Sequence, residues 1–304
     1  MTRGDWRDLD ASALRDWPAP AVADDADKEV RGRVLVAGGS SEIAGAVQLA
    51  AVSALRAGAG KLVIATAQSV AVQMSRAVPE ARVIAIRENK DGSFEPGGIA
   101  AMDKAFDGLG AVLAGPGLAE SPGNVDFIRA LLDQCRSVPV VLDAFAMDAV
   151  VEVGRFTQPV LVTPHAGEMA HLLGIAKDEV VRDAQRVARL AASAWNAVVA
   201  LKGATTWIAT PEGACWRHAC REPGLATSGS GDVLAGLVAG FAARGLALEQ
   251  ACAWGVVMHA MAGETLSKKM GPLGYLAREL PREVPALMKK VMRPVRRSPA
   301  PTAS

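Results

Sequence analysis

Short apolar runs alternate with helical segments along most of this chain, and no other feature constrains the fold as strongly. The runs are continuous rather than alternating, which is typical of strands buried on both faces of a parallel sheet. They occupy 33–37, 61–66, 81–86, 110–114, 139–143, 160–163 and 197–201. Because the alternation persists over about 250 residues, we predict one α/β domain with a mainly parallel sheet.

The segments between these runs are predicted to be helices, and a hairpin follows the last run. The predicted helices are 44–57, 124–134, one that opens at 164–168, 178–195, 232–243 and 248–267, and the predicted hairpin pairs 207–210 with 214–217. Residues 1–31 form a polar lead-in with one short helix, 10–17, ended by two prolines. The Pro-rich, basic segment 293–304 is predicted to be disordered.

Charge and hydropathy exclude several classes of partner. The formal net charge of +1 gives no reason to expect binding to nucleic acid or to an anionic membrane. The most apolar region, 233–266, is interrupted by Arg244, Glu249 and Glu264, so it lacks the roughly 18–20 apolar residues of a membrane span. No signal peptide is evident, and the four scattered cysteines form no CxxC motif. We expect a cytoplasmic protein with reduced cysteines.

A glycine-rich turn within 226–240 runs into a helix that carries one acid, Asp232. Gly229 and Gly231 allow a tight turn and a close approach of a ligand to the backbone. The N–H groups of Ser230, Gly231 and Asp232 would point out of the helix start, where the dipole favours negative charge. This arrangement suits an enzyme that holds a phosphate and removes a proton from a hydroxyl. A first-turn aspartate of an ordinary buried helix is the simpler alternative.

Glycines, acids and a histidine recur where the predicted strands end. They are found at 38–39, 115–117, 143, 165–168 and 202–203. Because ligands of parallel α/β sheets bind at the carboxyl ends of the strands, these groups are expected to share one crevice with the Gly229 loop. Neither the GxGxxG spacing of a dinucleotide site nor a P-loop motif is present.

The ordered motifs of the chain resemble those of a known family. They are Gly38-Gly-Ser40, Leu55-Arg-Ala-Gly-Ala-Gly60, Ala114-Gly-Pro-Gly-Leu118, Leu161-Val-Thr-Pro-His-Ala-Gly-Glu-Met169, Leu201-Lys-Gly-Ala204 and Pro223-Gly-Leu-Ala-Thr-Ser-Gly-Ser-Gly-Asp-Val-Leu-Ala-Gly236. From about Gly32 to Pro281 the chain is similar to the NAD(P)H-hydrate dehydratases and to the C-terminal domain of bifunctional nicotinamide-nucleotide repair proteins. The resemblance implies a ribokinase-like, three-layer α/β/α domain, which we place at 32–290.

The same resemblance implies an activity. NADH or NADPH hydrated at the nicotinamide ring would be phosphorylated on the added hydroxyl by ADP or ATP, and elimination of phosphate would restore the dihydronicotinamide. Mg²⁺ would accompany the nucleotide, and stand-alone relatives favour ADP. The family further implies a homo-oligomer, such as a tetramer, and an epimerase on a separate protein.

Roles for individual residues follow from matching the motifs. Asp232 would be the base, with Gly229, Ser230 and Gly231 stabilising charge on the transferred phosphoryl group. The hydrate would contact Ala44, Gly117, His165 and Asp232. The nucleotide would be held by Lys202, Gly203, Ala204, Thr205, Thr206 and Gly231. Glu168 stands where the wider superfamily keeps an acid that orders magnesium and its waters.

Simpler interpretations of these residues stay open. His165 is also placed to cap the following helix, Glu168 to interact with that helix dipole, and Lys202 to lie in a solvated loop. His171, His218 and His259 are expected to be structural.

Some positions depart from the family pattern: Asp27-Lys28-Glu29, Ala119, Phe145 in place of a usual aspartate, and Glu222 in place of a usual asparagine. These departures from the pattern bear on how well the substrate would fit and on how fast it would react. Two other functions therefore stay open, a kinase of the same superfamily acting on a thiazole or pyrimidine alcohol and a nucleotide-binding sensor without turnover.

Overall fold

The computed structural model describes residues 6–20, 27–95 and 97–292. Within them, ten strands form one sheet in the order β1-β10-β9-β8-β7-β6-β5-β2-β3-β4. The strands are β1 Arg7–Asp8, β2 Arg33–Ala37, β3 Lys61–Ala67, β4 Ala81–Ile86, β5 Ala111–Ala114, β6 Val140–Leu142, β7 Val160–Val162, β8 Val198–Leu201, β9 Thr205–Ala209 and β10 Cys215–Ala219. Neighbouring strands are parallel throughout the part of the sheet formed by β8, β7, β6, β5, β2, β3 and β4, whereas β9 is antiparallel to both of its neighbours. The predicted α/β fold with a mainly parallel sheet is confirmed.

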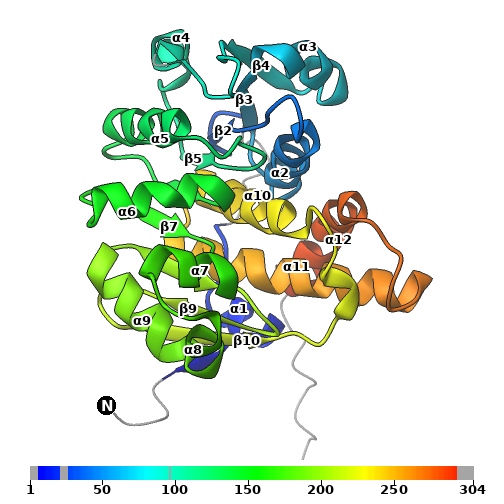
Figure 1. The fold of residues 1–304 in the computed structure, drawn as a ribbon. Helices are drawn as coiled ribbons and strands as arrows, with labels where there is room; N and C mark the ends of the chain where they lie inside the picture. The colour runs from blue at the N-terminus through cyan, green and yellow to red at the C-terminus, as the bar shows by residue number, and fades with distance from the viewer. Residues whose placement is uncertain (1–5, 21–26, 96, 293–304) are drawn as a thin grey trace, which may run out of the picture.

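Helices cover both faces of this sheet (Figure 1). They are α1 Ala11–Asp16, α2 Ala44–Arg56, α3 Gln68–Ala77, α4 Gly98–Ala101, α5 Pro122–Gln134, α6 Ala149–Val153, α7 Ala166–Leu173, α8 Lys177–Arg182, α9 Ala184–Trp195, α10 Ser230–Ala243, α11 Leu248–Met270 and α12 Leu280–Met292. Figure 1 shows α10, in yellow, and α11, in orange, crossing the middle of the molecule, and they pack on each other and, through α10, on α2.

Successive strand residues belong to two separate hydrophobic cores, which explains the continuous apolar runs. In β2, Val34 and Val36 face the core formed with α2, α10 and α11, whereas Leu35 and Ala37 face the core formed with α5 and α9. All four are completely buried. The expected three-layer α/β/α arrangement is therefore present.

Small residues allow α2 and α10 to pack closely. A methyl group on Gly236 would lie 2.2 Å from the Ala50 carbonyl oxygen, and one on Gly240 would lie 2.4 Å from the Ala54 carbonyl oxygen. Both distances are far below van der Waals contact, so only glycine fits. This packing fixes the position of α10, whose first turn carries Asp232.

The N-terminal segment lies along the outer edge of β10. The strand β1 pairs with β10 in parallel at Trp216 and Arg217, and Trp17 stacks on Trp216 with ring centroids 5.3 Å apart. The predicted helix at 10–17 is confirmed as α1, with Asp10 accepting hydrogen bonds from the N–H groups of Ser12 and Ala13. The predicted disordered tail at 293–304, and residues 1–5 and 21–26 of the lead-in, lie outside the described residues.

Several predicted boundaries are wrong, each for a local reason. The single helix predicted over 178–195 is two helices, because Asp183 leaves the helical region (φ −135°, ψ 46°) and its carbonyl starts a new helix by accepting from the Val187 N–H. The hairpin begins two residues earlier than predicted, so Thr205 and Thr206 belong to β9. The helix α12 was not predicted and contains Pro285, a residue that usually ends a helix. No helix among the described residues is both long and apolar enough to cross a membrane.

Candidate functional site

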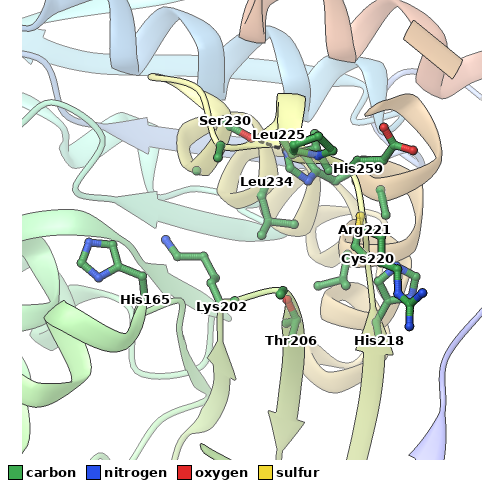
Figure 2. A pocket seen from close by; sticks show the side chains of 18 of the residues that line it. His165, Lys202, Thr206, His218, Cys220, Arg221, Leu225, Ser230, Leu234 and His259 are labelled. Carbon is green, nitrogen blue, oxygen red and sulfur yellow. Dashed lines mark hydrogen bonds between the residues drawn. The ribbon is translucent and has the colours of Figure 1, made fainter. Parts of the chain in front are cut away.

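A cavity of about 710 Å³ opens where β8, β9 and β10 meet the start of α10. This volume lies in the range of small-molecule sites. Figure 2 shows Lys202 and His165 on one side, Ser230 and Leu234 of α10 above, and Cys220 and Arg221 on the far side. Of the predicted site residues, the cavity is lined by His165, Lys202, Gly203, Ala204, Thr206, Ser230 and Gly231. Motifs from 165 to 231 therefore converge on one cavity.

Parallel strand ends bring the first two motifs together. His165 and Lys202 follow the neighbouring strands β7 and β8 and form an isolated parallel bridge, with the Lys202 N–H donating to the Pro164 carbonyl at 2.8 Å. The predicted convergence at the carboxyl edge of the sheet is confirmed for these two residues.

The glycine-rich turn starts α10 as predicted. Gly229 is the residue before the helix and adopts a left-handed conformation (φ 86°) that only glycine takes without strain. The helix begins at Ser230 and carries Asp232 in its first turn. A methyl group on Gly231 would lie 3.5 Å from the Lys202 ammonium nitrogen, so this lysine directly faces the helix start. The cationic side chain and the positive end of the helix together favour a bound anion.

Lys202 is held by acids rather than solvated. Its Nζ donates to Oδ1 of Asp143 at 3.1 Å and lies 3.9 Å from Oε2 of Glu168. Burial acts to lower the pKa of Lys202, but the charges of Asp143 and Glu168 outweigh it and raise that pKa, so the ammonium stays charged. Asp143 also accepts a 2.5 Å hydrogen bond from Oγ1 of Thr163. The solvated-loop interpretation of Lys202 is wrong.

Asp232 is poised to exchange a proton near neutral pH. The pKa of Asp232 is raised to about 6, chiefly by burial and also by the negative charge of Asp143, while the charge of Lys202 acts in the opposite direction. A carboxylate with such a pKa is a far better proton acceptor than an exposed aspartate. Asp232 is beside the cavity rather than among its lining residues.

His165 and Glu168 cap α7 reciprocally. Nδ1 of His165 accepts from the N–H groups of Gly167 and Glu168, each at 3.0 Å, and Oε2 of Glu168 accepts from the His165 N–H at 2.7 Å. The capping interpretation of His165 is therefore confirmed. Because Nδ1 is an acceptor, the neutral ring carries its proton on Nε2, which lies 3.7 Å from Oε1 of Glu168.

The acids near the cavity are suited to contact a magnesium ion only through its water ligands. Among the described residues, no group of three or more His, Cys, Asp or Glu side chains could hold a metal. Glu168 is 28% exposed and has one oxygen engaged in the cap, while Asp143 is already bound by Lys202 and Thr163. Mg²⁺ typically keeps several waters and uses one or two carboxylates together with ligand phosphates. Glu168 fits such a role through water.

Other predicted contacts lie outside this cavity. Gly117 follows β5, and a methyl group on it would lie 2.3 Å from the Ile43 carbonyl, directly before Ala44 at the start of α2. Gly117 and Ala44 are thus close to each other, yet neither lines the cavity, and Thr205 and Glu168 are also absent from its lining. Gly229, the residue before α10, does not line the cavity either.

Two of the departures from the family pattern line two different cavities. Glu222 lines the cavity of about 710 Å³. Phe145 lines another cavity of about 780 Å³, next to Asp148 and His171, whose side chains lie 3.2 Å apart. Ala119 accepts from the Asn124 side-chain amide with its carbonyl, which makes it part of the start of α5. Phe145 therefore does not intrude on the site beside Lys202.

Asp143, which contacts Lys202, and His259, which contacts Ser230, are among the residues that the sequence does not assign to the site. Asp143 was recognised only as an acid at a strand end, and His259 was expected to be structural. Nε2 of His259 lies 3.0 Å from Oγ of Ser230, and both side chains line the cavity (Figure 2). The position of Asp143 at a strand end was a usable signal, whereas His259 lies inside a helix and gives none.

The chain is similar to known proteins over most of its length. A family model described as NAD(P)H-hydrate dehydratase matches residues 34–286. The ADP-dependent (S)-NAD(P)H-hydrate dehydratase of Xanthomonas campestris is 46% identical over 96% of this chain and 100% of its own length. The bifunctional NAD(P)H-hydrate repair enzyme of Moorella thermoacetica is 35% identical over 87% of this chain, which spans 50% of that enzyme.

Solved structures agree with these matches. The ADP/ATP-dependent NAD(P)H-hydrate dehydratase of Bacillus subtilis, co-crystallised with ATP and Mg²⁺, superimposes with a TM-score of 0.81 at 27% identity, covering 95% of this chain and 100% of the other. A ribokinase-like superfamily protein of Enterococcus faecalis superimposes equally well, with a TM-score of 0.81 at 24% identity, over 97% of this chain and 99% of the other. The fold is ribokinase-like.

Proposed function

The chain belongs to the NAD(P)H-hydrate dehydratase family, and from this premise we propose that it uses ADP to dehydrate hydrated NADH and NADPH. One observation carries the proposal. A half-buried acid whose pKa is raised to about 6, Asp232, stands in the first turn of a glycine-started helix that faces the half-buried Lys202 at the cavity. A base, an anion site and a cation are the groups that phosphoryl transfer to a hydroxyl requires.

Asp232 acts as the base in the first step. It removes the proton of the hydroxyl on the hydrated ring, whose oxygen then forms a bond to the terminal phosphorus of ADP while the bond to the bridging oxygen breaks and AMP leaves. The backbone N–H groups at 229–231 stabilise negative charge on the transferred group. Lys202 adds a fixed positive charge there.

Elimination completes the reaction. The phosphorylated oxygen is a good leaving group, so the ring nitrogen electrons expel phosphate, and loss of a proton from the adjacent carbon restores the dihydronicotinamide. The net change is loss of water from the hydrate with conversion of ADP to AMP and phosphate. Because the base acts only as a carboxylate, its raised pKa sets the lower pH limit of the reaction.

We place the nucleotide in the cavity of about 710 Å³ as part of this proposal. Its phosphates face Lys202, Gly203 and Gly231, with Ala204, Thr205 and Thr206 along the same strand end. Its base faces the apolar wall formed by Leu225, Leu234, Val256 and Ala260. Mg²⁺ would neutralise phosphate charge, with Glu168 ordering its waters. The hydrate is placed toward His165, Ala44 and Gly117, next to Asp232.

The wider setting is part of the proposal. The catalytic unit is placed at 32–290, acts in the cytoplasm beside the nicotinamide cofactor pool, and forms a homo-oligomer. We assign epimerisation of the hydrate to a separate protein. Size-exclusion chromatography with light scattering tests the assembly.

The reaction is tested by mixing the purified protein with NADH hydrate, magnesium and either ADP or ATP, and following the absorbance band of reduced nicotinamide. A rise that needs ADP and disappears in Asp232→Asn is the expected result. Binding of ADP without any rise would contradict the dehydratase proposal and favour a superfamily kinase or a sensor. Phosphorylation of a thiazole or pyrimidine alcohol in place of the hydrate would identify the kinase.

A further inference from the structure

One polar contact near the helix start links two helices that are distant in sequence. Oγ of Ser230, the first residue of α10, lies 3.0 Å from Nε2 of His259, in the middle of α11. Ser230 is 6% exposed and His259 is 9% exposed. Both still line the cavity, and Figure 2 shows their contact as a dashed line at its upper wall.

The His259 ring is neutral at ordinary pH. The pKa of His259 is lowered to about 4, chiefly by burial and also by the charges of Lys202 and His218, while the backbone of Ser230 acts in the opposite direction. A neutral imidazole has one N–H donor and one acceptor nitrogen. The contact with Ser230 therefore has only two possible polarities.

The two polarities present different groups to the cavity. If the serine hydroxyl donated to the ring, its hydrogen would point into the protein and only oxygen lone pairs would face a bound anion. If Nε2–H donates to Oγ, the hydroxyl hydrogen is free to point into the cavity. The facing Lys202 ammonium and the helix start favour an anion there, so the second polarity is the compatible one.

We propose that His259 is a positioning residue, which donates from Nε2 to Ser230 and thereby turns the Ser230 hydroxyl hydrogen toward a phosphate oxygen of the nucleotide. The inference rests on the proposed function, because that function places the phosphates at this helix start. The donated bond also polarises the hydroxyl and strengthens its own hydrogen bond to the anion. A hydrogen bond to a charged group contributes enough that its loss weakens binding about 10- to 100-fold.

Paired variants of His259 separate this role from packing. A glutamine amide reaches about as far as Nε2 of histidine, whereas an asparagine amide reaches only as far as Nδ1. We expect His259→Gln to bind ADP nearly as the natural protein does, and His259→Asn to bind about 10- to 100-fold more weakly. Adenosine, which has no phosphate, is expected to bind all variants within about twofold, as measured by calorimetry or displacement.

A double-mutant cycle tests whether His259 acts through Ser230. Ser230→Ala is expected to lose ADP affinity as His259→Asn does, and the double variant is expected to lose no more than Ser230→Ala alone. Additive losses, or equal losses for ADP and adenosine, would overturn the inference. If His259→Asn fails to fold, as judged by circular dichroism, Ser230→Ala and His259→Gln still provide the contrast between ADP and adenosine. If the natural protein binds ADP but shows no turnover, the proposed function is contradicted. The comparison of ADP with adenosine then still tests the role of His259.

Discussion

The ammonium nitrogen of Lys202 lies 3.1 Å from Oδ1 of Asp143, and the two side chains are only 18% and 4% exposed. The partners are 59 residues apart in sequence and meet because β6 and β8 end at the same edge of the sheet. Charges removed from water need each other, since either one alone would carry its desolvation cost without compensation. The ion pair therefore links the stability of the fold to the charge balance around Asp232.

Removing one partner of this pair is predicted to be more harmful than removing both. Lys202→Met is expected to lower the free energy of unfolding by about 3–5 kcal/mol, because Asp143 loses its counter-charge. The double variant Lys202→Met, Asp143→Asn is expected to regain a large part of that loss. Urea unfolding at neutral pH measures both, and strictly additive costs would show that the pair is not coupled.

The rate of dehydration is predicted to fall as the pH drops below about 6, the pKa to which burial raises Asp232. Only the carboxylate accepts a proton, so kcat/KM, which reports the free enzyme, is expected to decrease about tenfold per pH unit below that value. Asp143→Asn removes a negative neighbour and is expected to move this acidic limb to lower pH. A pH profile of kcat/KM for both proteins checks the shift, and a limb that moves upward would contradict it.

Asp232→Asn is predicted to stabilise the fold at the same time as it abolishes turnover. The folded pKa of Asp232, about 6, exceeds the value of 3.8 for an exposed aspartate. The natural protein therefore loses stability as the pH rises between these values, by up to about 3 kcal/mol. Thermal unfolding is expected to show a higher Tm for the variant at about pH 8 and no difference below about pH 4. A variant that is less stable at about pH 8 would indicate that the carboxylate is not buried as described.

The contact between α2 and α10 is predicted to reject any added side chain. In Gly236→Ala the new methyl group would lie 2.2 Å from the Ala50 carbonyl oxygen, so the helices must separate, at a cost of about 1–3 kcal/mol or more. Gly45→Ala is the matched control, because no atom lies within 4 Å of its new methyl group. That control is expected to be neutral or to stabilise by up to about 1 kcal/mol, as measured by urea unfolding.

Cys220 is predicted to report nucleotide binding. It lines the cavity and is the partly exposed cysteine, whereas the other three cysteines are buried. Burial raises the pKa of Cys220, so alkylation by a maleimide is expected to be slow, and ADP is expected to slow it further. Mass spectrometry locates the modification, and Cys220→Ser serves as the control. Alkylation that ADP leaves unchanged would place the nucleotide elsewhere.

Features that depend on strand ends were predictable from the sequence. A continuous apolar run followed by a glycine, acid or histidine marks both the strand and the edge at which ligands bind, and on that basis His165 and Lys202 were expected at the edge where the structure has them. The turn at Gly229 was predictable because a left-handed residue before a helix requires glycine.

Features that depend on packing between helices were not predictable. His259 meets Ser230 only because α10 and α11 lie side by side, and nothing in the chain between these two residues, which are 29 positions apart, signals that contact. The direction of Phe145, into a cavity separate from the one beside Lys202, also depends on how α5 to α7 pack. The helix α3 was also missed; it is 10 residues long and buries only Val70, Ala71 and Met74.

The short strand β1 also limits which other chains this sheet can join. An open sheet edge offers unpaired N–H and C=O groups to any passing strand and can seed aggregation. Here the outer edge of β10 is occupied at Trp216 and Arg217 by the chain's own Arg7 and Asp8, two charged residues that discourage further strand addition. The N-terminal segment thus protects a sheet margin next to the cavity from misassembly, a role that requires no contact with any ligand.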